Sequence, residues 1–215
     1  MKICAICGYP FVFFVIFPPV KNFPKFRIAI FASGSGTNAE AIMEHFKEGP
    51  EVAVVLVLTN NPQAMVLQRA KKFHIPARVF SKVGFRETGE VLRWLKESEV
   101  THIVLAGFLW LVPMDMLKAY SNKIINIHPS LLPKYGGKGM YGEKVHDAVK
   151  QSGDKETGIT VHLVNERFDE GKILFQAHCP IVPVDSIDQI AAKVHGLEHA
   201  HYPQIIEQWI RGAKI

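Results

Sequence analysis

Hydrophobic and polar residues follow one another along this chain in a pattern that predicts strands and helices in alternation. RIAIFASGSGTNAEAIMEHF, over 27–46, reads as a buried strand, a glycine turn and then a helix that Thr37 or Asn38 could cap. Further strands are expected at 52–62, 75–80, 101–108 and 122–128, with helices at 63–73 and 86–97. This alternation over short connections predicts an α/β fold with a doubly wound, mostly parallel sheet flanked by helices.

The pattern changes in the second half of the chain. TGITVHLV (157–164) and KILFQAHCPIV (172–182) predict a pair of strands joined by NERFDEG, and a long helix is expected over about 185–211. The sequence has no internal repeat, low-complexity tract or flexible linker. We therefore expect residues 26–215 to form a single domain, a Rossmann-like sheet to which a β pair and a long helix are added.

The first 25 residues form an apolar extension to which the sequence assigns no role. YPFVFFVIFPPV, over 9–20, contains an uninterrupted apolar stretch of about eight residues, whereas a membrane span needs roughly 20. A small-x-small cleavage site of the kind that ends a signal peptide does not follow it. We expect a cytoplasmic protein that does not act at a membrane.

Charge and cysteine content exclude several classes of protein. The formal net charge of +5 suits small anionic substrates, but the chain lacks the run of five or six like charges typical of nucleic-acid-binding tails. Cys4 and Cys7 form a lone C-x-x-C without the second pair that a zinc site needs. The histidines at 195, 199 and 201 have no accompanying H-E-x-x-H motif. We expect no metal and no nucleic-acid partner.

The stretch NIHPSLLPKYGG, over 126–137, places an amide and an imidazole on one strand end. Side chains two apart in a strand point the same way, so Asn126 and His128 share a face. Pro129 restricts the backbone behind them. An amide and an imidazolium held in this way could stabilise an oxygen that becomes negative during acyl transfer. The alternative is a strand end whose polar groups only fix the loop that follows.

A second motif, Gly34-Ser35-Gly36-Thr37-Asn38, comes directly before a helix. The free amides of a helix N-terminus bind phosphate well. With Ala39 the run also fits the dinucleotide pattern G-x-G-x-x-A, but that pattern expects an acidic residue about 20 positions later, where this chain has Thr59-Asn60-Asn61. A phosphate monoester therefore fits better than NAD, and a turn chosen only for its backbone geometry is the alternative.

Asp169 lies in the link between the two later strands, in the sequence Phe168-Asp169-Glu170-Gly171. A carboxylate at this position could pair with His128, keep the imidazole protonated and take a proton from a nucleophile. The alternative is an Asp that only forms a turn before Gly.

Together these motifs resemble the folate-dependent formyltransferases, over about residues 26–211. The segments that carry the resemblance are FASGSGTN (31–38), VLAGFLWLVP (104–113), NIHPSLLPKYGG (126–137), GITVHLVNERFDEG (158–171) and LEHAHYP (197–203). Many members carry Gly-x-His after the prolines, where this chain has Gly137-Lys138-Gly139-Met140-Tyr141. The chain is most similar to the members that formylate glycinamide ribonucleotide in purine synthesis.

The resemblance implies an enzyme that transfers a formyl group from 10-formyltetrahydrofolate, as co-substrate, to the amine of glycinamide ribonucleotide. It implies that the catalytic residues are Asn126, His128 and Asp169. It implies that the phosphate and ribonucleotide are held by Gly36, Thr37, Asn38 and Glu198. It implies that the folate lies against Arg86, Leu109, Trp110, Leu111, Val112 and Asn126, although Arg86 fits an ordinary exposed helix position equally well.

Two other functions remain open from the sequence. One is a formyltransferase that acts on a different amine, such as that of a sugar nucleotide. The other, from a different class, is an NAD-dependent oxidoreductase, which rests on the G-x-G-x-x-A pattern alone. For the formyltransferase we expect small-molecule substrates and either a monomer or a homodimer.

Overall fold

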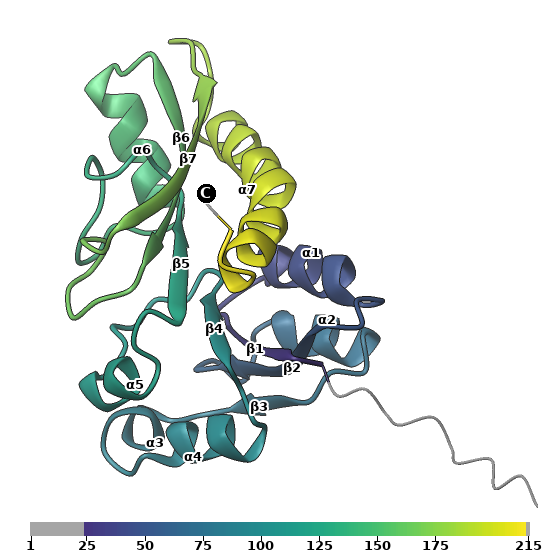
Figure 1. Ribbon diagram of the computed structural model, residues 1–215. Helices are drawn as coiled ribbons and strands as arrows, with labels where there is room; N and C mark the ends of the chain where they lie inside the picture. Colours follow the sequence, from purple (N-terminus) through teal and green to yellow (C-terminus); the bar gives the residue numbers. More distant parts are fainter. Residues whose placement is uncertain (1–23, 214–215) are drawn as a thin grey trace, which may run out of the picture.

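A computed structural model describes residues 24–213 of the chain (Figure 1). Most of the apolar N-terminal extension, including the Cys4/Cys7 pair, lies outside the described residues. The strands are β1 (Phe26–Phe31), β2 (Val52–Thr59), β3 (Ala77–Val79), β4 (His102–Leu105), β5 (Ile124–His128), β6 (Glu156–Leu163) and β7 (Ile173–Pro180). The helices are α1 (Thr37–Phe46), α2 (Val66–Lys72), α3 (Lys82–Arg86), α4 (Glu90–Glu97), α5 (Met114–Ala119), α6 (Glu143–Ser152) and α7 (Ile187–Ile210).

All seven strands belong to one sheet, in the order β3-β2-β1-β4-β5-β6-β7. The first five strands of that order pair in parallel, and the pairs β5–β6 and β6–β7 are antiparallel. The predicted α/β class, with a mostly parallel sheet and an added β pair, is confirmed. Strand order reverses between β1 and β4, and ligands of such sheets bind beyond the carboxyl ends of the strands at this point.

Helices cover both faces of the sheet (Figure 1). Ile28 and Ile30 of β1 point to the face covered by α1, α2 and α7, and Ala29 and Phe31 point to the face covered by α3, α4 and α5. Because both faces are buried, the parallel strands are apolar at consecutive positions, as the sequence pattern suggested.

The long helix α7 connects the two halves of the molecule. Its first residues are fixed by a capping box, in which the Ser186 hydroxyl accepts from the Gln189 amide and the Gln189 side chain accepts from the Ser186 amide. Farther along, the fully buried Tyr202 donates its hydroxyl proton to the Leu105 carbonyl at 2.9 Å. This contact fixes α7 against the end of β4, next to the carboxyl edge of the sheet.

Several local predictions were wrong. The helix expected over 86–97 begins only at Glu90, as α4, because its N-cap Gly89 adopts a left-handed φ of 65°, and the short helix α3 that ends at Arg86 was not predicted. Neither Thr37 nor Asn38 caps α1, whose N-cap is Gly36 without a side-chain hydrogen bond. The short helix α5 was not predicted, because its six residues give too little periodicity for an assignment.

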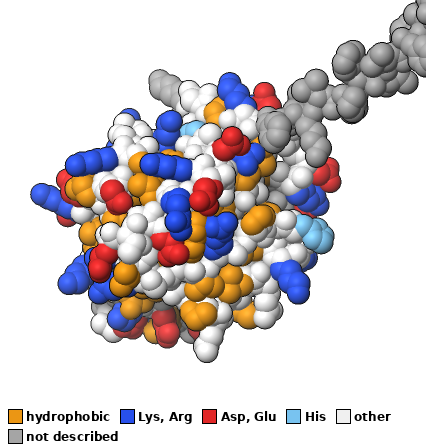
Figure 2. Space-filling model, turned by 90° about the horizontal axis from the view of Figure 1, so that it is seen from below, with side chains coloured by type: hydrophobic (Ala, Val, Ile, Leu, Met, Phe, Trp, Pro, Cys, Tyr) orange, Lys and Arg blue, Asp and Glu red, His pale blue; other side chains and the backbone are white. Residues whose placement is uncertain are grey.

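None of the helices among residues 24–213 is both long enough and apolar enough to cross a bilayer. On the face seen in Figure 2, basic and acidic side chains lie among hydrophobic ones, so that this face carries charge of both signs.

Candidate active site

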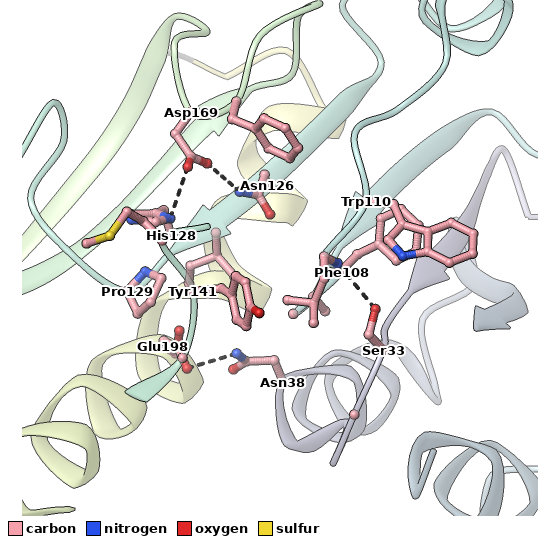
Figure 3. A pocket seen from close by; sticks show the side chains of 18 of the residues that line it. Ser33, Asn38, Phe108, Trp110, Asn126, His128, Pro129, Tyr141, Asp169 and Glu198 are labelled. Carbon is pink, nitrogen blue, oxygen red and sulfur yellow. Dashed lines mark hydrogen bonds and ion pairs between the residues drawn. The ribbon is translucent and has the colours of Figure 1, made fainter. Parts of the chain in front are cut away.

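A cavity of about 570 Å³ opens at the carboxyl ends of β1, β4 and β5. It is the place that the topology indicates for a ligand, because the strand order reverses there. Figure 3 shows polar groups at two ends of the cavity, with Asn126, His128 and Asp169 grouped together and Asn38 with Glu198 apart from them. The structure therefore brings the predicted catalytic and phosphate-binding residues to one cavity.

Asn126 and His128 lie on the same face of β5, as the alternation of the strand predicted. Ile125 and Ile127, on the opposite face, are buried beneath α1 and α7. The turn after His128 is fixed by Thr160 on the adjacent strand, whose hydroxyl donates to the Ser130 carbonyl at 2.7 Å. These contacts hold the two polar side chains with little freedom, which suits a preorganised site.

A second histidine, His162, completes this cluster, and sequence reasoning missed it. In the antiparallel pairing of β5 with β6, His162 lies directly opposite Asn126, and the Asn126 Nδ2 is 3.1 Å from the His162 Nε2. The His162 Nδ1 donates to the Leu163 carbonyl at 2.8 Å, which leaves the Nε2 of the neutral ring to accept from the Asn126 amide. His162 thus fixes the orientation of the Asn126 side chain.

Asp169 lies against both polar residues of β5. Its Oδ2 is 3.5 Å from the His128 Nδ1 and accepts from the Gly137 amide at 2.9 Å, and its Oδ1 is 3.5 Å from the Asn126 Nδ2. The Asp169 backbone has a φ of 57°, a left-handed conformation that is uncommon for a residue with a side chain. The loop between β6 and β7 therefore holds the carboxylate in place at a conformational cost.

The electrostatics of the His128–Asp169 pair differ in part from the sequence expectation. Burial lowers the pKa of His128, although the Asp169 carboxylate and the Tyr135 carbonyl oppose that effect. Burial would raise the pKa of Asp169, but the neighbouring imidazoles of His162 and His128 and the Gly137 amide together hold it below the ordinary value. The sequence suggested that Asp169 would favour the charged imidazole, but desolvation outweighs the carboxylate, and the pKa of His128 lies below its ordinary value.

The His128 ring has a defined orientation in this site. Its Nε2 is 2.8 Å from the Tyr135 carbonyl, which can only accept a hydrogen bond, so the Nε2 carries a proton. The Nδ1 faces the Asp169 carboxylate. A second proton taken up at the Nδ1 would be stabilised by this carboxylate, so the pair is arranged to accept a proton.

The glycine turn before α1 leaves the N-terminal amides of that helix without a side-chain cap. Gly36 has a φ of 72°, and a Cβ atom at this position would lie 2.6 Å from the Cβ of Val66. Only glycine fits here, because a side chain would meet both a strained backbone and the start of α2. The uncapped amides and the helix dipole would favour an anion at this end of the cavity.

Asn38 turns away from the helix terminus and binds Glu198 of α7. Its Nδ2 donates to the Glu198 Oε2 at 2.9 Å, while its buried Oδ1 has no partner among residues 24–213. Burial raises the pKa of Glu198, although the Asn38 hydrogen bond and His195 act in the opposite direction. The Glu198 side chain is thus fixed in a cavity wall where its second oxygen can receive a hydrogen bond from a ligand.

The residues expected to contact folate lie mostly at one side of the cavity. Leu109, Trp110 and Leu111 line it, and Arg86, at the exposed end of α3, also lines it. The Trp110 ring is held edge-on against the ring of Phe80, with 5.9 Å between the centroids. Val112 does not line the cavity, because its side chain is 4% exposed and packs in the core beneath α4 and α5.

In the described part of the chain, His, Cys, Asp and Glu side chains nowhere gather in a group of three or more that could hold a metal ion. His195 and His199 stack on each other at the surface of α7, and His201 lies against Phe175.

The model of the formyl transferase family matches residues 26–206 of the chain. The chain belongs to the formyl transferase family. It is 39% identical over 186 residues to the chloroplastic phosphoribosylglycinamide formyltransferase of Vigna unguiculata, a match that covers 84% of this chain and 60% of the relative. It is 39% identical over 189 residues to phosphoribosylglycinamide formyltransferase of Bacillus subtilis (strain 168), with 85% of this chain and 93% of the relative covered.

A solved structure of the same family has the same fold. The crystal structure of phosphoribosylglycinamide formyltransferase from Anaplasma phagocytophilum superimposes with a TM-score of 0.80 at 30% identity, covering 87% of each chain. The recognition of a formyltransferase from its motifs is thereby confirmed, since both the family model and the fold agree with it.

Proposed function

We propose that this formyl transferase family member moves the formyl group of 10-formyltetrahydrofolate to the amine of glycinamide ribonucleotide in purine synthesis. The observation that carries the proposal is one cavity with an amide–imidazole–carboxylate cluster at one end and an uncapped helix N-terminus at the other. Relatives named phosphoribosylglycinamide formyltransferase support the choice of substrate. An acceptor with a phosphate and an amine at opposite ends would span this cavity.

The phosphate end of the acceptor would be bound by the amides of Gly36, Thr37 and Asn38. The unpartnered Asn38 Oδ1 and the second oxygen of Glu198 would accept hydrogen bonds from the ribose or the glycinamide. These contacts would place the amine next to the cluster on β5, because the cavity continues from α1 to that strand. The aliphatic and aromatic side chains of Leu109–Leu111, with Arg86 at the rim, would hold the folate.

In the reaction, the amine nitrogen attacks the formyl carbon and the carbonyl π bond opens. A tetrahedral intermediate with a negative oxygen forms. The Asn126 amide, oriented by His162, donates a hydrogen bond to that oxygen, and the positive charge that His128 gains on taking up a proton stabilises it further. The bond between the carbon and N10 of the folate then breaks, which leaves the formylated amine and tetrahydrofolate.

A proton must move from the amine to the leaving N10 during this sequence. The neutral His128 is suited to accept it, since its Nδ1 faces Asp169 and the imidazolium that results would be paired with the carboxylate. The ring then returns the proton to N10. The lowered pKa of His128 leaves the ring neutral at physiological pH, so that it is free to accept a proton from the attacking amine.

We further propose that residues 26–215 form one cytoplasmic formyltransferase domain, monomeric or homodimeric, that acts on small molecules and not on nucleic acid. The charge pattern noted above and the small size of the cavity support this reading.

The test is an absorbance assay for tetrahydrofolate formation with purified protein. We expect saturable product formation that requires both 10-formyltetrahydrofolate and glycinamide ribonucleotide. Turnover with an amino sugar nucleotide in place of glycinamide ribonucleotide would reassign the acceptor. Failure of every amine to support product formation would refute the proposed reaction.

A further inference from the structure

A row of polar side chains leads from the phosphate end of the cavity toward the catalytic end. It starts with the hydrogen bond from Asn38 to Glu198, whose Oε2 is also 3.9 Å from the His195 Nε2. The His195 ring lies perpendicular to the ring of His146 on α6, with 6.4 Å between the ring centroids. All four residues line the cavity. His146 is the buried histidine of this row, and neither the sequence motifs nor the proposed reaction gives it a role.

His146 is buried and has unused hydrogen-bonding capacity. Its side chain is 2% exposed, and its Nδ1 has no hydrogen-bond partner within the described part of the chain. A buried nitrogen without a partner is costly, and native proteins rarely leave such a group unpaired without a reason. Because another part of the ring lines the cavity, a bound molecule can reach the imidazole.

The packing of α6 fixes the position of this ring. Val145 and Val149, on the same helix, are fully buried and pack against Ile181 and against Ile190 of α7. This packing holds the His146 imidazole at the wall of the cavity.

The surroundings of His146 determine which chemical groups it can bind. Burial, together with the nearby His195 and His128, lowers the pKa of His146 to about 4. The ring is therefore neutral at physiological pH, with one nitrogen that donates and one that accepts. Such a ring suits an uncharged amide better than a phosphate, and it does not repel an approaching ammonium group.

We propose that His146 is a specificity-determining residue for the acceptor, whose neutral imidazole hydrogen-bonds to the uncharged amide segment between the ribose phosphate and the reactive amine. The inference rests on the proposed function, which supplies an acceptor of this shape. His146 then forms the middle contact of the acceptor, between the amides of α1 and the cluster on β5.

The test compares His146→Phe, which keeps a ring of similar size without nitrogens, with His146→Leu and His146→Asn. We expect the Phe and Leu variants to raise the Michaelis constant for glycinamide ribonucleotide about tenfold, the effect of one lost buried hydrogen bond. The Asn variant, which keeps a donor and an acceptor, should recover part of that loss. The Michaelis constant for 10-formyltetrahydrofolate should stay within about twofold of the wild-type value in all three.

The control is His178→Phe, which changes a half-exposed histidine on β7 outside this cavity and should leave both constants unaltered. An unchanged acceptor constant in a folded Phe or Leu variant would overturn the inference while leaving the proposed function intact. Parallel changes in both constants, with no recovery by Asn, would assign His146 a packing role instead. Absence of transfer by the wild-type protein would refute both proposals.

Discussion

The reactivity of the site depends on a few side chains whose properties are set by neighbours far away in the sequence. His128 is 3% exposed, so desolvation lowers its pKa, and Asp169, 41 positions later, opposes that effect through its negative charge. Asn126 is oriented by His162, which lies 36 positions later. The residue types can be read from the sequence, but the charge that each side chain carries depends on the distances between them in the folded protein.

The titration of His128 tests this balance directly. We expect its ring to titrate with a midpoint below the ordinary value of 6.5 in the unliganded protein, because burial outweighs the carboxylate. Asp169→Asn removes the group that favours the charged ring, so the midpoint should fall further. The measurement is a histidine-labelled NMR titration, with the His128 signal assigned by its loss in His128→Asn. A rise of the midpoint in Asp169→Asn would contradict the assigned electrostatics.

Asn126 and His128 could be singled out from the sequence because they share one face of a strand end, but the catalytic roles of these two residues and of Asp169 are implied by the resemblance to the folate-dependent formyltransferases. His162 could not be singled out, since the period of two within a strand gives the face of a side chain but not the register against the next strand. The burial of Val112 could not be predicted from the sequence either. Its neighbours Leu109–Leu111 turn toward the cavity, while Val112 fills the core behind them.

Among the local elements, the glycine turn between β1 and α1 imposes the strictest requirement on the sequence. Gly36 combines a left-handed backbone with contact against Val66, so its replacement by alanine affects the loop that is proposed to hold phosphate. The exposed Gly196 within α7 has open space around the position that a Cβ would take. Replacement of each glycine by alanine should therefore have opposite effects on the stability of the protein.

Gly36→Ala should lower the free energy of unfolding by about 2 kcal/mol, from the left-handed backbone and the steric conflict combined. It should also raise the Michaelis constant for the acceptor, because the amides of the turn are displaced. Gly196→Ala should raise stability by about 0.5–1 kcal/mol, the usual gain in a helix interior. Urea denaturation measures both. Equal stability of the two variants would show that the turn does not need glycine.

The seven strands and α7 were predicted from their apolar pattern, whereas the helices α3, α5 and α6 were not. The strands on both sides of the switch point and α7 have enough apolar residues for their period to be recognised. The helices α3 and α5 have five and six residues, respectively, and depend on tertiary contacts such as the burial of Phe85 and Met116. The cap of α1 was misassigned because Asn38 forms a better partnership with Glu198 of α7, a contact 160 residues away along the chain.

For the molecule as a whole, the arrangement of the sheet explains why one cavity receives groups from so many segments. The parallel strands deliver the glycine turn, the Leu109–Leu111 segment and the β5 residues to one edge, while α6 and α7 close the side. Alternation of strands and helices was sufficient to predict this edge. The enclosure by α6 was not predictable, because its packing against α7 involves residues that are distant in sequence.

Binding of the acceptor should stabilise the whole fold, because the native state alone assembles these segments. At a concentration of glycinamide ribonucleotide about 100 times its dissociation constant, we expect a gain of about 2.7 kcal/mol. For a chain of this size that corresponds to a rise in melting temperature of roughly 5–10 °C. Asn38→Ala should require a higher concentration for the same rise, whereas Asn165→Ala, outside the cavity, should match the wild type. Failure of the nucleotide to shift the transition at any concentration would argue against this acceptor.

The most direct test of the central claim is turnover by Asn126→Ala and His128→Ala, measured together with acceptor binding by calorimetry. If the amide and the imidazole stabilise the transition state, kcat should fall by about 100-fold or more in each variant. The dissociation constant for glycinamide ribonucleotide should stay within about threefold of the wild-type value, because these groups act on the reacting carbon. Near-normal kcat in either folded variant would contradict the account.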